Sequence, residues 1–252
     1  MLAPIIPWNN LDSLIQEEIN EFRKIKSGIH IALLGTTRGG KTTIATGGSG
    51  EPGRGILRNF EDVLVLDTTG DPGSIHDYGK PLNKFGAIHG HRRLTVNDMT
   101  IRSKEKVYNA IAKAVKQGNI AIYADELRQL TDKKFFGLGP ALDHVWLFTA
   151  KKGVSLVGGT QAPRWLPGAF YDQSKLHFIF GIRDKRSRMR LGEISGDTET
   201  LQAVIPSLKR FEFAYIGLDG SVMVSKFDLT PQKIDTRKKL VIQKSPRESL
   251  TT

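Results

Sequence analysis

The chain has 252 residues, of which 39% are hydrophobic, and this is ample for one large α/β domain with a buried core. It contains no cysteine, which excludes disulfides, thiolate metal sites and cysteine nucleophiles. The formal net charge of +11 is typical of proteins with a polyanionic partner, most often nucleic acid, although acidic lipid would also satisfy it.

The first predicted element is an amphipathic helix. Apolar residues recur at helical spacing from Leu11 to Ile25, with Asn10 available as the N-cap and Gly28 as the stop. We expect this helix to pack on the core, with docking on a neighbouring subunit as the alternative. No apolar run approaches the roughly 20 residues of a membrane span, and the start Met1–Pro7 is too short and uncharged for a signal peptide, so we expect a soluble protein.

The next stretch carries the strongest motif of the chain. A β-branched, apolar run ends at a glycine that opens the pattern G-x-x-x-x-G-K-[ST], whose residues are Gly35, Thr36, Thr37, Arg38, Gly39, Gly40, Lys41, Thr42 and, following it, Thr43. The glycines let backbone N–H groups point at phosphate oxygens. Lys41 is expected to reach the β- and γ-phosphates, and Thr42 to hold Mg²⁺. The sequence therefore predicts a nucleotide-phosphate site between a strand and a helix.

A shortened helix and a Gly-rich loop over 47–55 should follow, and then a buried strand, Val63–Asp67, that ends in acids. Three histidines, His76, His89 and His91, lie in the next segment without the close carboxylate spacing of a metal site, so we expect a loop and a short strand over Leu94–Val96.

A second motif follows a predicted helix over Lys104–Lys116. The strand from Asn119 to Ala124 ends in Asp125 and Glu126, which has the form of a Walker B element. Asp125 would hold Mg²⁺ directly or through water, and Glu126 would activate the attacking water as a general base.

The remaining elements alternate as in an α/β sheet. We expect a helix over Leu142–Lys151, a strand Val154–Gly159 ending in Thr160 and Gln161, a loop over 162–167, a strand Lys175–Ile182, a cationic run 183–190, a helix Thr198–Leu208, and a hairpin of Arg210–Ile216 with Ser221–Phe227. The cations of 183–190 fit either a solvated helix face or phosphate contacts. From Pro231 the chain is basic and polar and is expected to be a flexible tail.

The nucleotide is expected to be ATP. Asp67-Thr68-Thr69-Gly70 fits the D-x-x-G switch sequence of GTPases, but the chain has no Asn-Lys-x-Asp run for reading guanine. The adjacent Asp125 and Glu126 also suit a hydrolysing motor better than a small-metabolite kinase.

In this order the motifs resemble the FtsK/HerA superfamily of P-loop ATPases over roughly residues 28–227, and within it the compact genome-packaging ATPases of membrane-containing viruses and phages. The resemblance implies a RecA-like (ASCE) P-loop fold, with a mostly parallel sheet flanked by helices and a C-terminal hairpin. It also implies that Gln161 senses the γ-phosphate, and that an arginine, Arg164 or Arg183, completes the site of a neighbour in a ring of six or five copies. The domains would be an N-terminal helical segment 1–27, an ATPase domain 28–229 and a basic tail 230–252.

The function that follows is Mg²⁺-dependent, ATP-driven translocation of double-stranded DNA through backbone contacts, for viral genome packaging in the host cytoplasm or on the virion, with a capsid or membrane-vertex partner. A conjugative or plasmid-transfer ATPase of the same superfamily is the near alternative. A nucleotide-switched protein of GTPase type and a membrane-associated assembly ATPase are alternatives from other classes.

Overall fold

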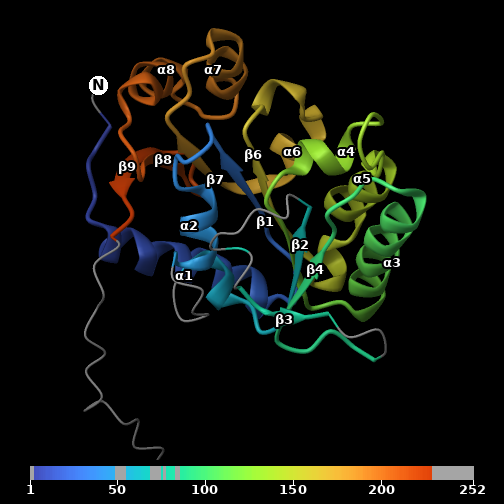
Figure 1. Ribbon diagram of the computed structural model, residues 1–252. Coiled ribbons are helices and arrows are strands. Elements are labelled where there is room, and N and C mark those ends of the chain that lie inside the picture. Colours follow the sequence, from blue (N-terminus) through green and yellow to red (C-terminus); the bar gives the residue numbers. More distant parts are fainter. Residues whose placement is uncertain (1–2, 49–54, 69–74, 76–77, 83–85, 229–252) are drawn as a thin grey trace, which may run out of the picture.

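The computed structural model describes residues 3–48, 55–68, 75, 78–82 and 86–228, and is shown in Figure 1. Its helices are α1 (Trp8–Lys24), α2 (Lys41–Thr46), α3 (Ile101–Gln117), α4 (Leu127–Thr131), α5 (Gly139–Phe148), α6 (Gly168–Gln173), α7 (Lys185–Gly192) and α8 (Thr198–Val204), with short 3₁₀ turns η1 (Ile56–Asn59), η2 (Ala150–Lys152), η3 (Pro163–Trp165) and η4 (Ile205–Ser207). Its strands are β1 (His30–Leu34), β2 (Val63–Asp67), β3 (Lys80–Pro81), β4 (His91–Thr95), β5 (Ala121–Ala124), β6 (Ser155–Thr160), β7 (Ser174–Phe180), β8 (Glu212–Ile216) and β9 (Val222–Lys226).

Within the described residues the strands form one nine-stranded sheet in the order β3-β4-β2-β5-β6-β1-β7-β8-β9. Pairing is parallel from β3 through β7, and β7-β8-β9 are antiparallel. Strand β6 lies between β1 and β5, so the strand that ends in Thr160 separates the phosphate-loop strand from the strand that ends in the two acids. This is the mostly parallel P-loop fold with a C-terminal hairpin that the sequence predicted.

Helices cover both faces of the sheet (Figure 1). Because successive strand residues point to opposite faces, β1 sends Ile31 and Leu33 into one core and Ala32 and Leu34 into the other. The first core is closed by α1, α2 and η1, and the second by α3, α5 and α6. Burial on both faces explains why the central strands are uniformly apolar rather than alternating.

The predicted N-terminal helix packs against the C-terminal hairpin. Trp8 contacts Phe213 and Phe227 edge-on or tilted, with ring centroids 6.2 and 4.7 Å apart. Glu18 accepts hydrogen bonds from the hydroxyl of Tyr215 and from the backbone N–H of Leu218, and burial raises its pKa. These contacts attach α1 to the sheet, as expected for a helix packed on the core.

Several element boundaries differ from those predicted. The N-cap of α1 is Pro7 and not Asn10, because the helix begins two residues before Asn10, at Trp8. The short strand expected at Leu94–Val96 lies instead at His91–Thr95, a half-exposed strand with too few apolar residues to mark its start. The helix expected over Leu142–Lys151 begins at Gly139 and ends at Phe148, and η2 follows it.

Other predictions concern residues outside the described part of the chain. These include most of the 47–55 loop, the D-x-x-G residues Thr69 and Gly70, and the tail 230–252. Among the described residues no helix has both the length and the apolar character needed to cross a membrane.

Candidate nucleotide site

The predicted site residues follow the carboxyl ends of four adjacent strands. The phosphate loop follows β1, Asp125 and Glu126 follow β5, Gln161 follows β6, and Arg183 follows β7. Because these strands are parallel, their carboxyl ends meet at one edge of the sheet, where α/β folds bind ligands. The structure therefore brings together residues that are far apart in the sequence.

The phosphate loop requires glycine at its two ends. A Cβ on Gly35 would lie 2.6 Å from Cβ of Phe180, and Gly40 has a φ of +123° with Phe180 and Phe211 ring carbons 3.0 Å from its added Cβ. Side chains at either position would clash with the β7–β8 wall of the loop. Helix α2 begins directly after Gly40, so the N–H groups of its first turn are available to a phosphate.

Lys41 is held inside this loop. Its Nζ donates to the carbonyl oxygens of Gly35 and Thr36 at 2.8 and 2.9 Å, and the residue is only 6% exposed. Burial lowers the pKa of Lys41, while the carboxylates of Asp125 and Glu126 oppose that shift. The ammonium thus lies between the loop and the two acids, where it can pair with a phosphate.

Thr42 and Asp125 are in direct contact. The Thr42 hydroxyl donates to Oδ1 of Asp125 at 2.7 Å, and the hydroxyl of Tyr123 donates to the same oxygen at 2.5 Å. Burial, together with the Asp125 carboxylate, raises the pKa of Tyr123, which therefore stays a donor. A hydroxyl and a carboxylate oxygen side by side are hard oxygen ligands of the kind that Mg²⁺ takes together with nucleotide phosphates.

Glu126 is restrained by hydrogen bonds on both carboxylate oxygens. Oε1 accepts from the Thr160 hydroxyl at 2.8 Å and from the backbone N–H of Arg128 at 3.3 Å, and Oε2 accepts from the backbone N–H of Gln161 at 3.1 Å. The residue is 8% exposed and caps α4 with its side chain. Its carboxylate is therefore fixed against the end of β6.

Gln161 connects that strand end to the phosphate loop. Its Oε1 accepts a hydrogen bond from the Thr37 hydroxyl at 2.5 Å, while its backbone holds Glu126. One residue thus touches both the loop and the predicted general base.

The two arginines predicted to complete a neighbour's site, Arg164 and Arg183, are exposed at the rim of the candidate nucleotide site. The guanidinium of Arg164 is 3.7 Å from Oδ1 of Asp184 and lies over the ring of Trp165, whereas exposed Arg183 lines a groove beside the phosphate loop. This groove has a volume of about 310 Å³, and its cationic lining residues are Arg38, Arg183, Lys209 and Arg210. The groove extends the positive charge of the loop toward solvent.

Some residues of the site were not predicted. No role was predicted for Tyr123 or for Thr160, whose hydroxyls donate hydrogen bonds to Asp125 and Glu126, respectively. The sequence analysis also missed Phe211. Its backbone N–H donates a hydrogen bond to the carbonyl oxygen of Gly39 at 3.1 Å, and its ring lies against Gly40. The polar strand ends were a usable signal for Thr160, but no local pattern connects Phe211 with the loop.

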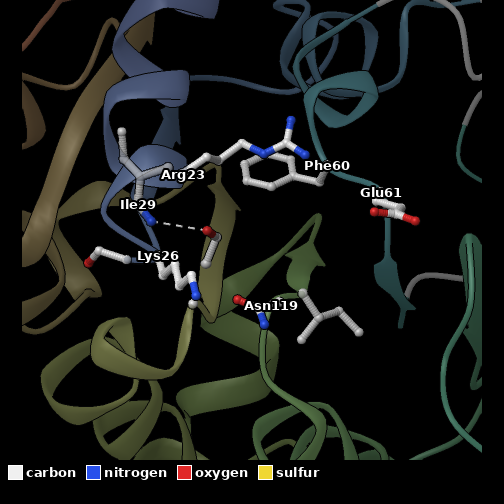
Figure 2. A pocket seen from close by; sticks show the side chains of 10 residues that line it. Arg23, Lys26, Ile29, Phe60, Glu61 and Asn119 are labelled. Carbon is white, nitrogen blue, oxygen red and sulfur yellow. Dashed lines mark hydrogen bonds between the residues drawn. The ribbon is translucent and has the colours of Figure 1, made fainter. Parts of the chain in front are cut away.

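A separate cavity of about 200 Å³ lies at the opposite edge of the sheet, where β1, β5 and β6 begin (Figure 2). Arg23 and Lys26 border it, and the N–H of Ile29 donates to Oγ of Ser155 at 3.0 Å within it. None of the predicted site residues lines this cavity, so it is distinct from the candidate nucleotide site.

Comparison with solved structures identifies proteins of the same fold. The DNA-packaging ATPase B204 from Sulfolobus Turreted Icosahedral Virus has a TM-score of 0.58 and 15% identity, over 80% of this chain and 97% of that chain. The genome packaging NTPase B204 from Sulfolobus turreted icosahedral virus 2, in complex with sulfate, has a TM-score of 0.59 and 16% identity, over 79% of this chain and 96% of that chain.

A third similar structure is the cytoplasmic domain of the Thermomonospora curvata Type VII Secretion ATPase EccC, with a TM-score of 0.51 and 13% identity, over 82% of this chain and 25% of that chain. No protein-family profile and no curated sequence matches this chain. At these identities the likeness shows the fold alone, and this chain shares the fold of these ATPases.

Proposed function

We propose that this chain is an ATP-driven translocase of double-stranded DNA that packages a viral genome. The observation that carries the proposal is the hydrogen bond from Thr42 to Asp125, which lies beside Lys41 and Glu126 at one edge of the sheet. The chain also shares its fold with packaging ATPases. This arrangement would supply one residue for binding a nucleotide phosphate, others for coordinating a metal, and one for activating water.

Each residue would have one role in hydrolysis. Lys41 would leave the carbonyls of Gly35 and Thr36 to bind the β- and γ-phosphates, as the loop N–H groups bind the remaining oxygens. Glu126 would accept a proton from the attacking water. Gln161 would sense the presence of the γ-phosphate through its hydrogen bond with Thr37.

The oxygens of Thr42 and Asp125 fit Mg²⁺, which would supply positive charge to the phosphate oxygens. We therefore propose Mg²⁺ as the metal, with Thr42 and Asp125 as its two protein ligands.

The choice of DNA as substrate rests on charge. A net charge of +11 suits a sequence-independent grip on a phosphate backbone. We propose a ring of six or five copies in which Arg164 or Arg183, both exposed at the rim of the site, reaches the nucleotide of a neighbour. Such a motor would work in the host cytoplasm or on the virion, docked on a capsid or membrane-vertex partner.

The test is phosphate release from ATP and from GTP, with and without duplex DNA, at modest salt. We expect ATP to be preferred and DNA to raise turnover, and we expect Lys41→Ala and Glu126→Gln each to lower kcat by about 100-fold or more. Lys151→Ala and Glu199→Gln, at exposed positions, are the matched controls. Preference for GTP without a response to DNA would replace the motor with a nucleotide switch. Stimulation by acidic lipid vesicles in place of DNA would indicate a membrane assembly ATPase.

A further inference from the structure

A buried tyrosine shares its hydrogen-bond acceptor with Thr42. The hydroxyl of Tyr123, in β5, donates to Oδ1 of Asp125 at 2.5 Å, and the hydroxyl of Thr42 donates to the same oxygen at 2.7 Å. Tyr123 is fully buried, and the other residues of β5 are alanines and an isoleucine. A hydroxyl in such a strand costs free energy unless it is hydrogen-bonded, so Tyr123 depends on the carboxylate that follows the strand.

The ring of Tyr123 is fixed by its neighbours in the sheet. Tyr123 pairs with Val65 of β2 and with Val157 of β6, and all three side chains belong to the core that α1, α2 and η1 close. Thr42 reaches Asp125 from α2, which covers the same face of the sheet. Because the ring is packed between its neighbours, the Tyr123 hydroxyl is a fixed point that orients the shorter Asp125 side chain.

Asp125 has a limited number of positions for hydrogen-bond donors and for a metal ion. Each oxygen of a carboxylate offers about two lone-pair positions, and on Oδ1 the hydroxyls of Thr42 and Tyr123 take both. Thr42 is itself the other proposed ligand of Mg²⁺, so its hydrogen would give way when Oδ1 binds the ion. The hydrogen bond from Tyr123 would stay, because the Tyr123 oxygen is not a proposed ligand.

We infer that Tyr123 is a positioning residue of the metal site and that it acts through Asp125. Its hydroxyl keeps Oδ1 beside the Thr42 oxygen, and so raises the affinity of the nucleotide-bound protein for a hard divalent cation. This inference rests on the proposed function, in which Thr42 and Asp125 bind Mg²⁺, and it adds the residue that orients one of these ligands. Partners that orient metal ligands typically contribute about 10- to 100-fold to metal affinity.

The first experiment measures metal binding without hydrolysis. Mn²⁺ is the probe, because it prefers oxygen ligands as Mg²⁺ does and its free form is measured by electron paramagnetic resonance. With a nonhydrolysable ATP analogue bound and protein in excess, we expect Tyr123→Phe to raise the dissociation constant of Mn²⁺ by about 10- to 100-fold. The affinity for the analogue in EDTA should change little, because Lys41 and the loop bind the phosphates.

Two outcomes of this experiment overturn the inference. One is equal Mn²⁺ affinity in wild type and in Tyr123→Phe. The other is an equally large loss of affinity for the analogue in EDTA, because Tyr123 would then support the phosphate loop and not the metal site.

Tyr215→Phe is the matched control. Tyr215, in β8, is also a buried tyrosine, and its hydroxyl donates to the carboxylate of Glu18 on α1, away from the candidate nucleotide site. Each substitution removes one buried hydrogen bond to a carboxylate, so we expect each to lower the midpoint of thermal unfolding by roughly 2–4 °C. Only Tyr123→Phe should weaken Mn²⁺ binding. An equal loss of Mn²⁺ affinity in Tyr215→Phe would trace the effect to general destabilisation and would overturn the inference.

The second experiment tests whether Tyr123 acts through Asp125. In the background of Asp125→Ala, where the phosphates of the analogue still bind Mn²⁺, Tyr123→Phe should cause no further loss of Mn²⁺ affinity, because the carboxylate that it orients is gone. The full loss in that background would overturn the inference, since Tyr123 would then act on the metal by another route.

Failure of this inference and failure of the proposed function give different results. Mn²⁺ binding requires neither DNA nor hydrolysis, so wild-type turnover that ignores DNA would contradict the motor while the Mn²⁺ titration still decides the role of Tyr123. Turnover that responds to DNA, with equal Mn²⁺ affinity in wild type and Tyr123→Phe, overturns the inference alone. If the wild-type complex binds Mn²⁺ no better than the free analogue does, the proposed metal site and the inference both fail.

Discussion

The hydroxyl of Thr42 donates a hydrogen bond to Oδ1 of Asp125 at 2.7 Å, and this contact joins the two motifs of the chain. Thr42 lies in the first turn of α2, which follows β1 and the phosphate loop, and Asp125 lies directly after β5. Strand β6 separates β1 from β5 in the sheet. The same two oxygens are the proposed Mg²⁺ ligands.

Thr42→Ala should therefore lower ATP hydrolysis by about 100-fold and raise the Mg²⁺ concentration needed for half-maximal hydrolysis, because the ion loses one of its oxygen ligands. Loss of this hydrogen bond should cost only about 1 kcal/mol of the free energy of unfolding. The measurement is phosphate release across a Mg²⁺ titration, with Thr42→Ser as the control that keeps the hydroxyl. Unchanged Mg²⁺ dependence in Thr42→Ala would place the ion elsewhere.

Gln161→Ala should lower kcat for ATP by about tenfold with little change in KM, because the contact with Thr37 is proposed to act on the γ-phosphate during reaction rather than on nucleotide binding. Steady-state kinetics with the exposed-residue variant Gln202→Ala as the control would measure this. A rise in KM at constant kcat would instead make Gln161 a binding residue.

Gly40→Ala should lower the free energy of unfolding by about 1–3 kcal/mol and prevent nucleotide binding, because its Cβ would press on the rings of Phe180 and Phe211 at a left-handed backbone position. Thermal unfolding with and without ATP is the measurement. Gly196→Ala is the control, since no atom lies within 4 Å of its added Cβ, and it should stay within about 0.5 kcal/mol of wild type. Equal effects of the two variants would contradict the assigned role of Gly40.

Acid should destabilise the fold through His177. Burial lowers its pKa from 6.5 to about 4, so the unfolded chain binds a proton between those values that the folded chain does not. The charged or titratable groups around it are Tyr171 and Asp172 of α6, Arg190 of α7, Glu193 directly after α7, and Lys175 of its own strand. Stability supplied by neutral His177 is thus full above pH 6.5 and is lost as the pH falls toward 4.

Between pH 7 and pH 5 this loss amounts to about 2 kcal/mol. The difference in unfolding free energy between those two pH values should be smaller by that amount in His177→Gln than in wild type. Chemical unfolding at both pH values is the measurement, and His144→Gln, at an exposed position of α5, is the control. An equal pH dependence in wild type and His177→Gln would show that another group causes the acid loss.

The sequence predicted the parts of the site that are local. Residues Gly35–Thr43 and the pair Asp125 and Glu126 are each contiguous, and parallel strands bring their ends to one edge. What holds these residues is not local. The hydroxyl of Thr160 reaches Glu126 because Ala124 pairs with Gly158 in the β5–β6 register, and Phe211 reaches Gly39 only because the chain returns from η4 past the loop.

Elements that were missed, such as α6, or placed only in part, such as β4, have similar physical causes. Helix α6 has only six residues, GAFYDQ, which is too short to show a helical period. Strand β4, HRRLT, is half-exposed near the sheet edge and lacks the apolar run that marked β1, β2 and β5.

The most direct test of the central claim is displacement of a triplex-forming oligonucleotide from a DNA duplex by the wild-type chain and by Glu126→Gln. If the protein moves along duplex DNA, wild type should displace the oligonucleotide in the presence of ATP and Mg²⁺. Neither Glu126→Gln with ATP nor wild type with a nonhydrolysable ATP analogue should displace it. ATP hydrolysis that responds to duplex DNA without any displacement would contradict translocation.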